Sequence, residues 1–197
     1  FVPSFYTRTS AIIAFAPSDG LLVDFNRDGR PDLPIGRLPV RTLAEAEEAV
    51  RKLLAYENQP ARERALLVAG GSDADLDFAQ ALRGFDEALP QPYERRYVVQ
   101  DQLGLAAARA ELVQAMNAGS SLLGFVGHSA PAQWTFDPLF RATDVATLAA
   151  NANQPLVLQF GCWTTYYVSP QANTMAHRLL LTPARGAAAV FGAAVLM

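Results

Sequence analysis

The feature that most constrains this chain is its alternation of short apolar segments with amphipathic ones. Apolar runs of about four to eight residues are typical of strands buried on both faces, and apolar residues three or four apart are typical of helices. The predicted strands cover residues 10–16, 63–71, 95–100, 121–127, 154–161 and 186–195. The predicted helices cover residues 43–57, 76–89, 105–119, 142–152 and 172–181. This order predicts one α/β domain whose parallel sheet is covered by helices on both faces.

Local signals support several of the predicted helix ends. Thr42 precedes the helix predicted over 43–57, and Glu45 follows three residues later, which is the pattern of a capping box. Gly119 is placed to close the helix predicted over 105–119, and Thr143 to cap the one predicted over 142–152.

Composition excludes several classes of protein. The 197 residues are 51% apolar and carry a net charge of only −3, without a cluster of Lys and Arg, so nucleic acid is not expected as a partner. No apolar stretch reaches the roughly 18 residues of a membrane span. One cysteine excludes an internal disulfide, and two histidines argue against a Cys/His zinc site. The chain lacks an initiator Met and stops within an apolar run, so we expect residues 1–197 to be one domain of a longer protein, truncated at both ends.

Ligand sites in parallel α/β folds lie beyond the carboxyl ends of the strands. The residues at these positions are 70–75, the pair His128 and Ser129, and Cys162. We therefore expect any reactive centre to come from these three loops.

One hypothesis takes Ser129 as a nucleophile. The segment "GHSAP" (127–131) is close to the G-x-S-x-G elbow of serine hydrolases, and Asp144 and His177 could complete a triad. That elbow requires a helix directly after the serine, whereas "APAQWTFDP" contains two prolines and no helical period. His177 lies inside a predicted helix, where a solvated or packed imidazole is the ordinary interpretation. The serine hypothesis is therefore the weaker one.

A second hypothesis pairs His128 with Cys162. Each follows an apolar strand and a glycine, and the two are 34 residues apart, about the length of one βαβ unit. That spacing could bring both side chains to one sheet edge, where a nearby imidazole favours the reactive thiolate and backbone N–H groups could stabilise an oxyanion. The alternative is that both are unrelated loop residues, and a lone cysteine is often only a small buried hydrophobe.

Three blocks of the sequence resemble one family. "VGHSAPAQW" (126–134) and "LQFGCWTTYY" (158–167) look like the His and Cys blocks of the gingipain-type cysteine peptidases, which are peptidase family C25 of the caspase-like clan CD. "DGRPDLPIGRLPVRTLAEAEEAVRKLLAYE" (28–57) is similar to that family's upstream segment, and "GAAAVFGAAV" (186–195) matches in character. The resemblance covers most of the chain. It implies a caspase-like three-layer α/β/α sandwich with a mostly parallel sheet.

The same resemblance implies roles for individual residues. Cys162 would be the nucleophile of an endopeptidase, and His128 the acid that protonates the leaving amine and the base for the deacylating water. The backbone N–H groups of Cys162 and Ser129 would form the oxyanion hole. An acidic residue after an earlier strand would orient the histidine, with Asp73 as the first candidate and Asp75 as the second. A loop Asp is also a common turn former.

The resemblance further implies protein or peptide substrates, a secreted or cell-surface bacterial protein, and no cofactor for catalysis. It says nothing of the oligomeric state. One departure from the family is Ser129, where the family usually has Gly. If the loop needs a backbone conformation that only Gly adopts, the chain would be an inactive relative that acts as a binding or secretion-system component.

A candidate calcium loop lies upstream, in "DFNRDGRPD". Alternating oxygen ligands around a glycine turn suit a hard cation, and the ligand candidates are Asp24, Asn26, Asp28 and Asp32. The closing Glu of an EF-hand is replaced by Ile35, so the alternative is a turn without metal. Such a calcium ion would be structural.

Aromatic residues flank the proposed dyad, and we expect them to form walls of a substrate pocket, with core packing as the alternative. These residues are Trp134, Trp163, Tyr166 and Tyr167.

Overall fold

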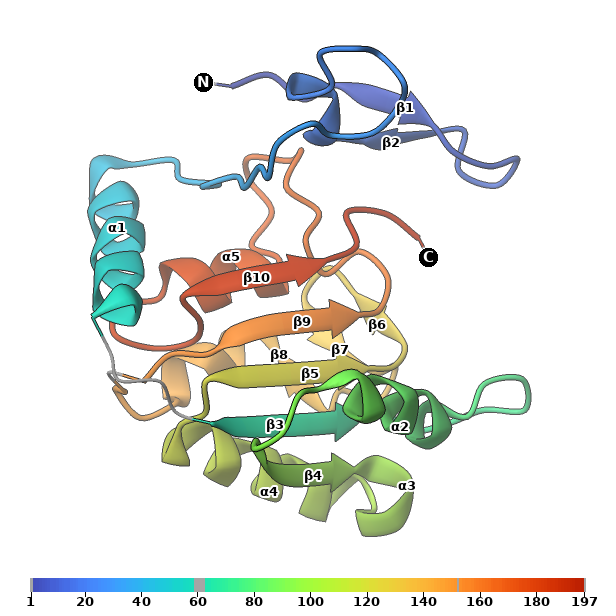
Figure 1. Cartoon of the computed structure of the whole chain (residues 1–197). Coiled ribbons are helices and arrows are strands. Elements are labelled where there is room, and N and C mark those ends of the chain that lie inside the picture. Colours follow the sequence, from blue (N-terminus) through green and yellow to red (C-terminus); the bar gives the residue numbers. More distant parts are fainter. Residues whose placement is uncertain (1, 59–62, 152, 197) are drawn as a thin grey trace.

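A central five-stranded sheet organises the computed structural model, which describes residues 2–58, 63–151 and 153–196. All neighbouring strands are parallel, in the order β10-β9-β5-β3-β4 (Figure 1). The strands are β3 (Arg64–Ala69), β4 (Glu94–Val99), β5 (Leu122–Val126), β9 (Leu156–Phe160) and β10 (Ala189–Gly192). The parallel sheet predicted from the apolar runs is therefore confirmed.

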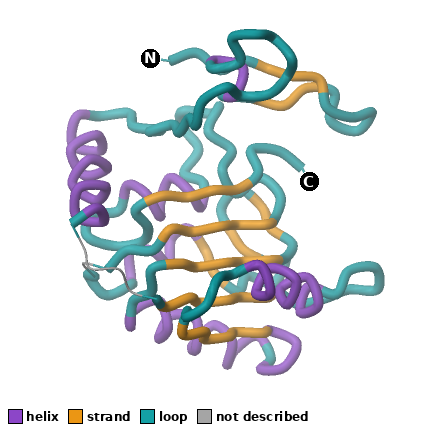
Figure 2. Tube along the Cα trace, in the orientation of Figure 1, coloured by secondary structure: helices purple, strands orange, loops and turns teal. Residues whose placement is uncertain are grey.

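Helices cover both faces of this sheet, which gives the predicted α/β/α sandwich (Figure 2). On one face, α4 (Leu105–Ala118) and α5 (Met175–Leu181) contribute Leu112 and Leu179 to a core that also contains Phe125 of β5. On the other face, α2 (Phe78–Ala88) packs Phe78 and Leu82 against β3 and β5. Two-sided burial is the reason that β3 and β5 are almost continuously apolar.

The helix α1 (Leu43–Glu57) begins and ends where the sequence predicts. The Thr42 hydroxyl accepts the backbone N–H of Glu45 at 3.2 Å, and the Glu45 carboxylate accepts the backbone N–H of Arg41 at 2.6 Å. The buried Lys52 donates from Nζ to the carbonyl oxygens of Leu179 (2.9 Å) and Arg185 (2.5 Å), and this attaches α1 to the end of α5.

Three predicted elements are shorter in the structure. The helix predicted over 142–152 is a 3-10 helix, η2 (Ala142–Thr147), whose N-cap is Arg141 and not Thr143, because the Asp144 carboxylate accepts the Arg141 N–H. The helix predicted over 172–181 starts only after its cap Thr174, and the last strand is reduced to β10. Another short helix, α3 (Gln100–Leu103), lies between β4 and α4. The helix α4 ends at Gly119, as predicted, and Gly119 has a positive φ of 80°.

The strand predicted over 10–16 is wrong. Residues 6–17 form an antiparallel hairpin of β1 (Tyr6–Arg8) and β2 (Phe15–Pro17), apart from the main sheet (Figure 1). The apolar residues 11–13 lie in its turn, where Ser10 N–H donates to the carbonyl oxygen of Ile13 and Ile12 is 80% exposed. A one-turn 3-10 helix, η1 (Gly20–Leu22), follows.

A second small sheet lies directly after β5. Its antiparallel strands, in the order β6-β7-β8, are β6 (Ser129–Ala130), β7 (Gln133–Trp134) and β8 (Phe140–Arg141). Because β6 starts one residue after His128, this sheet determines the course of the chain on one side of the predicted site.

Candidate active site

A glycine follows the carboxyl end of each of three neighbouring strands, β3, β5 and β9. Val126 of β5 is in register with Ala69 of β3 and Phe160 of β9, so the glycines that follow these residues are neighbours. Backbone hydrogen bonds continue the ladder one step further, because Gly70 N–H donates to the Val126 carbonyl oxygen (2.9 Å) and Gly127 N–H to that of Phe160 (3.1 Å).

The glycines allow these strand ends to approach closely. A Cβ on Gly161 would lie 2.6 Å from the carbonyl oxygen of Gly127, and a Cβ on Gly127 would lie 3.2 Å from the Cα of Gly70. Larger residues would push the strand ends apart. The loops that carry Asp73, His128 and Cys162 therefore start side by side.

His128 contacts a carboxylate from the neighbouring loop. Its Nε2 is 2.6 Å from Oδ2 of Asp73, whose Oδ1 accepts the backbone N–H groups of Asp75 (2.8 Å) and Leu76 (2.9 Å). The hydrogen bond to His128, with the two backbone donors, holds the pKa of Asp73 below its ordinary value. Of the two candidate carboxylates, Asp73 is the one that reaches His128, while Asp75 contributes a backbone N–H.

Two phenyl rings enclose the imidazole of His128. Phe78 packs edge-on at 4.9 Å between ring centroids, and Phe136 stacks at 4.6 Å with an interplanar angle of 25°. The His128 side chain keeps 25% of its surface exposed. Because Nε2 faces Asp73, Nδ1 is the ring nitrogen left for a thiol or a substrate. Sequence analysis missed both rings: Phe78 was assigned only to a helix, and Phe136 lies in a loop without a periodic signal.

Cys162 lies at a sharp turn directly after β9 and is partly exposed. The next residue, Trp163, has a positive φ of 63°, which is unusual for a bulky side chain, and its N–H donates to the carbonyl oxygen of Val195 (3.0 Å). The carbonyl oxygen of Cys162 accepts the hydroxyl of Ser129 at 2.8 Å. One hydrogen bond therefore connects the nucleophile candidate to the residue after His128.

Ser129 has the geometry of a supporting residue. It lies in β6, opposite Trp134, so a short strand follows His128 where a nucleophile elbow would have a helix. The φ angle of Ser129 is not positive, so the conformation at this position does not require glycine. Its hydroxyl donates to a carbonyl and does not contact a histidine.

The other members of the hypothetical serine triad have different partners. Asp144 pairs with Arg109 at 3.1 Å, and His177 Nδ1 lies 2.7 Å from the hydroxyl of Thr174 within its own helix. The structure does not bring these residues to Ser129, which removes the structural basis for the serine-hydrolase alternative.

The predicted pocket aromatics lie in different surroundings. Trp134 is fully buried, stacks on Phe125 and donates from Nε1 to Gln159 Oε1 (2.7 Å), so it belongs to the core and the assignment as a pocket wall is wrong. Trp163 and Tyr166 are partly exposed and pack edge-to-face at 5.5 Å between centroids, next to Cys162 in the chain.

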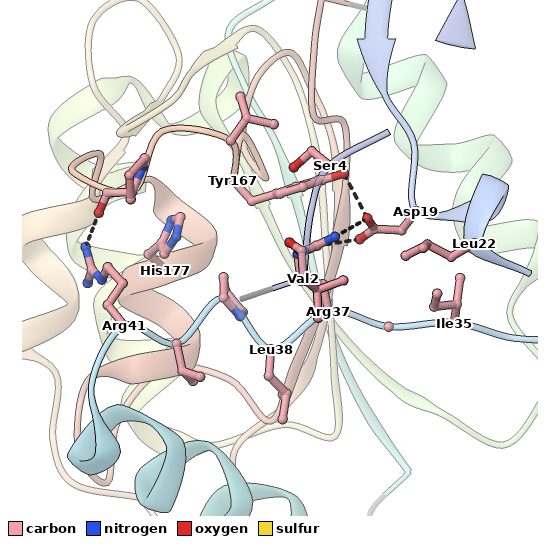
Figure 3. A pocket seen from close by; sticks show the side chains of 15 residues that line it. Val2, Ser4, Asp19, Leu22, Ile35, Arg37, Leu38, Arg41, Tyr167 and His177 are labelled. Atoms are coloured by element: carbon pink, nitrogen blue, oxygen red, sulfur yellow. Dashed lines mark hydrogen bonds and ion pairs between the residues drawn. The ribbon is translucent and has the colours of Figure 1, made fainter. Parts of the chain in front are cut away.

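A cavity lies elsewhere in the molecule, between residues 35–41 and residues 167–170 (Figure 3). Its volume is about 480 Å³, and Arg37 makes a two-pronged contact with Asp19 across it, at 2.6 and 2.8 Å. Tyr167 donates to Asp19 (3.1 Å), and burial raises the pKa of this hydroxyl to about 12. Asp73, His128 and Cys162 are not among its lining residues.

The candidate calcium residues form a compact polar turn. Both carboxylate oxygens of Asp24 accept backbone N–H groups, from Asp28 (3.1 Å) and Gly29 (2.9 Å), and Asp32 accepts that of Phe25 (2.7 Å). Asn26 accepts from the Asp28 N–H at 3.0 Å. Across residues 2–58, 63–151 and 153–196, no three His, Cys, Asp or Glu side chains are grouped to hold a metal ion. The carboxylates of the turn therefore do not converge on one ion here, and a structural calcium stays a prediction.

Comparison with solved structures identifies the fold as that of the gingipains, which is caspase-like. The "Crystal structure of the Arg specific cysteine proteinase gingipain R (RGPB)" superposes with a TM-score of 0.78 at 16% identity, covering 92% of this chain and 45% of that one. The complex of Porphyromonas gingivalis RgpB pro- and mature domains gives 0.77 at 17% identity, with the same coverage. A structure described only as a protease gives 0.77 at 17% identity, covering 92% of this chain and 41% of that one. This chain thus spans less than half the length of each.

The family model of peptidase family C25 matches residues 1–197, so the chain belongs to that family. No curated protein sequence matches significantly. In the described part of the chain, none of the helices has the length and apolar character that a membrane span requires.

Proposed function

We propose that this chain is the part of a cysteine endopeptidase that carries the reactive centre, with Cys162 as nucleophile, His128 as general acid and base, and Asp73 as the residue that orients His128. Peptidase activity is the class of its family. The observation that carries the assignment is the 2.6 Å contact between His128 and Asp73, at the same sheet edge as Cys162.

The contacts of each residue support its proposed role. Asp73 holds Nε2 of His128, so Nδ1 is available to exchange a proton with the thiol and then with the leaving amine. Phe78 and Phe136 restrict the rotation of the ring. Ser129 connects the two strand ends through its hydroxyl, while its own N–H and that of Cys162 are the proposed oxyanion donors.

The reaction would then run in two steps. The Cys162 thiolate attacks the scissile carbonyl carbon, and the C–N bond breaks as His128 delivers a proton to the departing amine, leaving a thioester. His128 then takes a proton from water, whose oxygen attacks the thioester carbon. The C–S bond breaks, the carboxylic acid product leaves, and the Cys162 thiolate and protonated His128 are regenerated.

Substrates and location are proposed at the level of the family. We propose protein or peptide substrates and a secreted or cell-surface setting. An inactive relative remains the opposite outcome of the test below, although the ordinary backbone conformation of Ser129 removes one reason to expect inactivity.

The test is covalent labelling with a panel of peptidyl chloromethyl ketones that differ in the P1 residue, read by mass spectrometry. It uses the full-length parent and the 197-residue chain, each as wild type, His128→Ala and Ser129→Ala, with His177→Gln as the matched control histidine. We expect an adduct on Cys162 that is lost in His128→Ala and retained in the other two variants. No Cys162 adduct with any probe, even in the full-length protein, would overturn the proposal and leave an inactive binding domain.

A further inference from the structure

We propose that Phe136 forms the S1′ subsite, the surface that contacts the substrate residue directly after the scissile bond, and that it selects an apolar residue there. This inference rests on the proposed function, and it goes beyond it by assigning a specificity to the leaving-group side of the site.

Phe136 is an unusually exposed aromatic residue for its position. One face of its ring stacks on the imidazole of His128, yet the residue remains 74% exposed. Single exposed hydrophobic side chains are common on protein surfaces, and Phe136 differs from these by its contact with the proposed general acid. The stacked face is used by the protein, and the remaining surface is available to a ligand.

The loop that carries Phe136 is held firmly. The N–H of Thr135 donates to the carbonyl oxygen of His128 (2.7 Å), and the Thr135 hydroxyl accepts the N–H of Leu139 (2.9 Å). The side-chain amide of Gln133 donates to the carbonyl oxygens of both Thr135 (3.0 Å) and Phe136 (3.1 Å). Thr135 itself has a positive φ of 64°, an unfavourable conformation that these contacts maintain. The exposed ring is therefore presented by an ordered loop.

The chemistry then places one part of the substrate beside this ring. A general acid must lie within hydrogen-bond distance of the amine nitrogen that it protonates. In a peptide, that nitrogen belongs to the P1′ residue, and its Cα is only about 1.46 Å further on. A P1′ side chain therefore lies close to any group that stacks on the acid, and on His128 the exposed group is Phe136.

An open aromatic surface favours apolar and aromatic partners over small or charged ones. One methylene more or less in a hydrophobic pocket changes discrimination by about 10- to 200-fold. Because Phe136 is 74% exposed, we expect the low end of that range, about tenfold.

The experiment uses internally quenched peptides with one fixed unprimed sequence, taken from the best chloromethyl ketone, and with Leu, Phe, Ser, Gly or Asp at P1′. The full-length protein is assayed as wild type, Phe136→Ala and Phe136→Tyr. Phe25→Ala is the matched control, because Phe25 is also an exposed phenylalanine (68%) and lies in the upstream turn. Chloromethyl ketone labelling of Cys162 is measured in parallel, since these probes carry no P1′ residue.

We expect wild type to prefer Leu and Phe over Gly by about tenfold in kcat/KM, at the low end of hydrophobic discrimination. Phe136→Ala should remove that preference, so its kcat/KM should fall about tenfold more on the Leu and Phe peptides than on the Gly peptide or in labelling, whereas Phe136→Tyr and Phe25→Ala should retain the preference. An equal loss on all peptides and in labelling would mean that Phe136 acts only through His128, and would overturn the subsite. An unchanged P1′ profile would do the same. Absence of both hydrolysis and labelling in wild type would instead overturn the proposed function itself.

Discussion

The two histidines of the chain lie in opposite kinds of surroundings. His128 follows a strand, keeps a quarter of its side chain exposed, and contacts a carboxylate from another loop. His177 lies inside α5, is 3% exposed, and bonds to Thr174, the N-cap of the same helix. Burial, followed by the positive charge of Arg41, lowers the pKa of His177, so its neutral form is favoured.

This difference shows what makes a histidine available for chemistry. A ring that exchanges protons needs access to a substrate and a partner that tolerates both charge states, and the Asp73 carboxylate provides that partner for His128. His177 bonds to the cap of its own helix and lines the separate cavity beside residues 35–41, so it does not share the surroundings of His128. Substitutions at His128, at His177 and at their partners test this difference.

The largest expected effect on activity comes from removing the imidazole of His128. His128→Ala should reduce peptide hydrolysis by about 10²- to 10⁴-fold, the range for loss of a general acid or base. His177→Gln should leave hydrolysis per folded molecule within about twofold and lower the stability by about 1–3 kcal/mol, the cost of disturbing a buried hydrogen bond. Steady-state kinetics and thermal unfolding measure both. Similar losses of hydrolysis in the two variants would show that His128 has no special part in the reaction.

A smaller loss is expected at the carboxylate. Asp73→Asn should lower kcat by about tenfold to a hundredfold, less than the roughly 10⁴-fold known for a buried triad carboxylate, because Asp73 is 43% exposed. Asp75→Asn is the matched control, since its backbone N–H, and not its side chain, contacts Asp73. Because its pKa is held below the ordinary 3.8, Asp73 should stay ionised at mildly acid pH, and its contribution should be lost only below that value. If kcat of Asp73→Asn equals that of wild type, Asp73 does not orient His128.

Removing one hydroxyl from each region should give opposite profiles. Thr174→Ala should destabilise the protein by about 0.5–2 kcal/mol through loss of a helix cap, without changing the labelling of Cys162. Ser129→Ala should cost about 0.5–1.5 kcal/mol and slow labelling by a few-fold, because the bond to the Cys162 carbonyl is lost. Unfolding curves and labelling rates are the measurements. Faster or unchanged labelling in Ser129→Ala would argue against its positioning role.

The smallest effect concerns acid stability. The pKa of His177 is lower in the folded chain than its ordinary value of 6.5, so the unfolded chain takes up this proton first as the pH falls. Stability is therefore retained above pH 6.5 and declines below it. When the pH is lowered through 6.5, the melting temperature of wild type should fall more than that of His177→Gln. Parallel curves would show that the buried ring does not contribute.

The sequence predicted the parts of this protein that depend on local patterns. Apolar periodicity identified the five main strands and the helix α1, and position at a strand end separated His128 and Cys162 from His177. The turn at Ile12 and the burial of Trp134 were missed, because hydropathy alone does not show whether an apolar residue meets the core or solvent. Phe136 stacks on His128 through tertiary contacts of a short sheet, and no spacing rule in the sequence indicates them.

The edge formed by Gly70, Gly127 and Gly161 also affects when the site can exist during folding. Asp73 and His128 are 55 residues apart in the chain, and Ser129 and Cys162 are 33 apart, so three separate strands must pair before the groups meet. Contacts between such distant residues form late, since long loops must close first. A chain in which β9 is not yet docked carries Asp73, His128 and Cys162 but not their arrangement. The proposed reactive centre is therefore complete only once β3, β5 and β9 have paired.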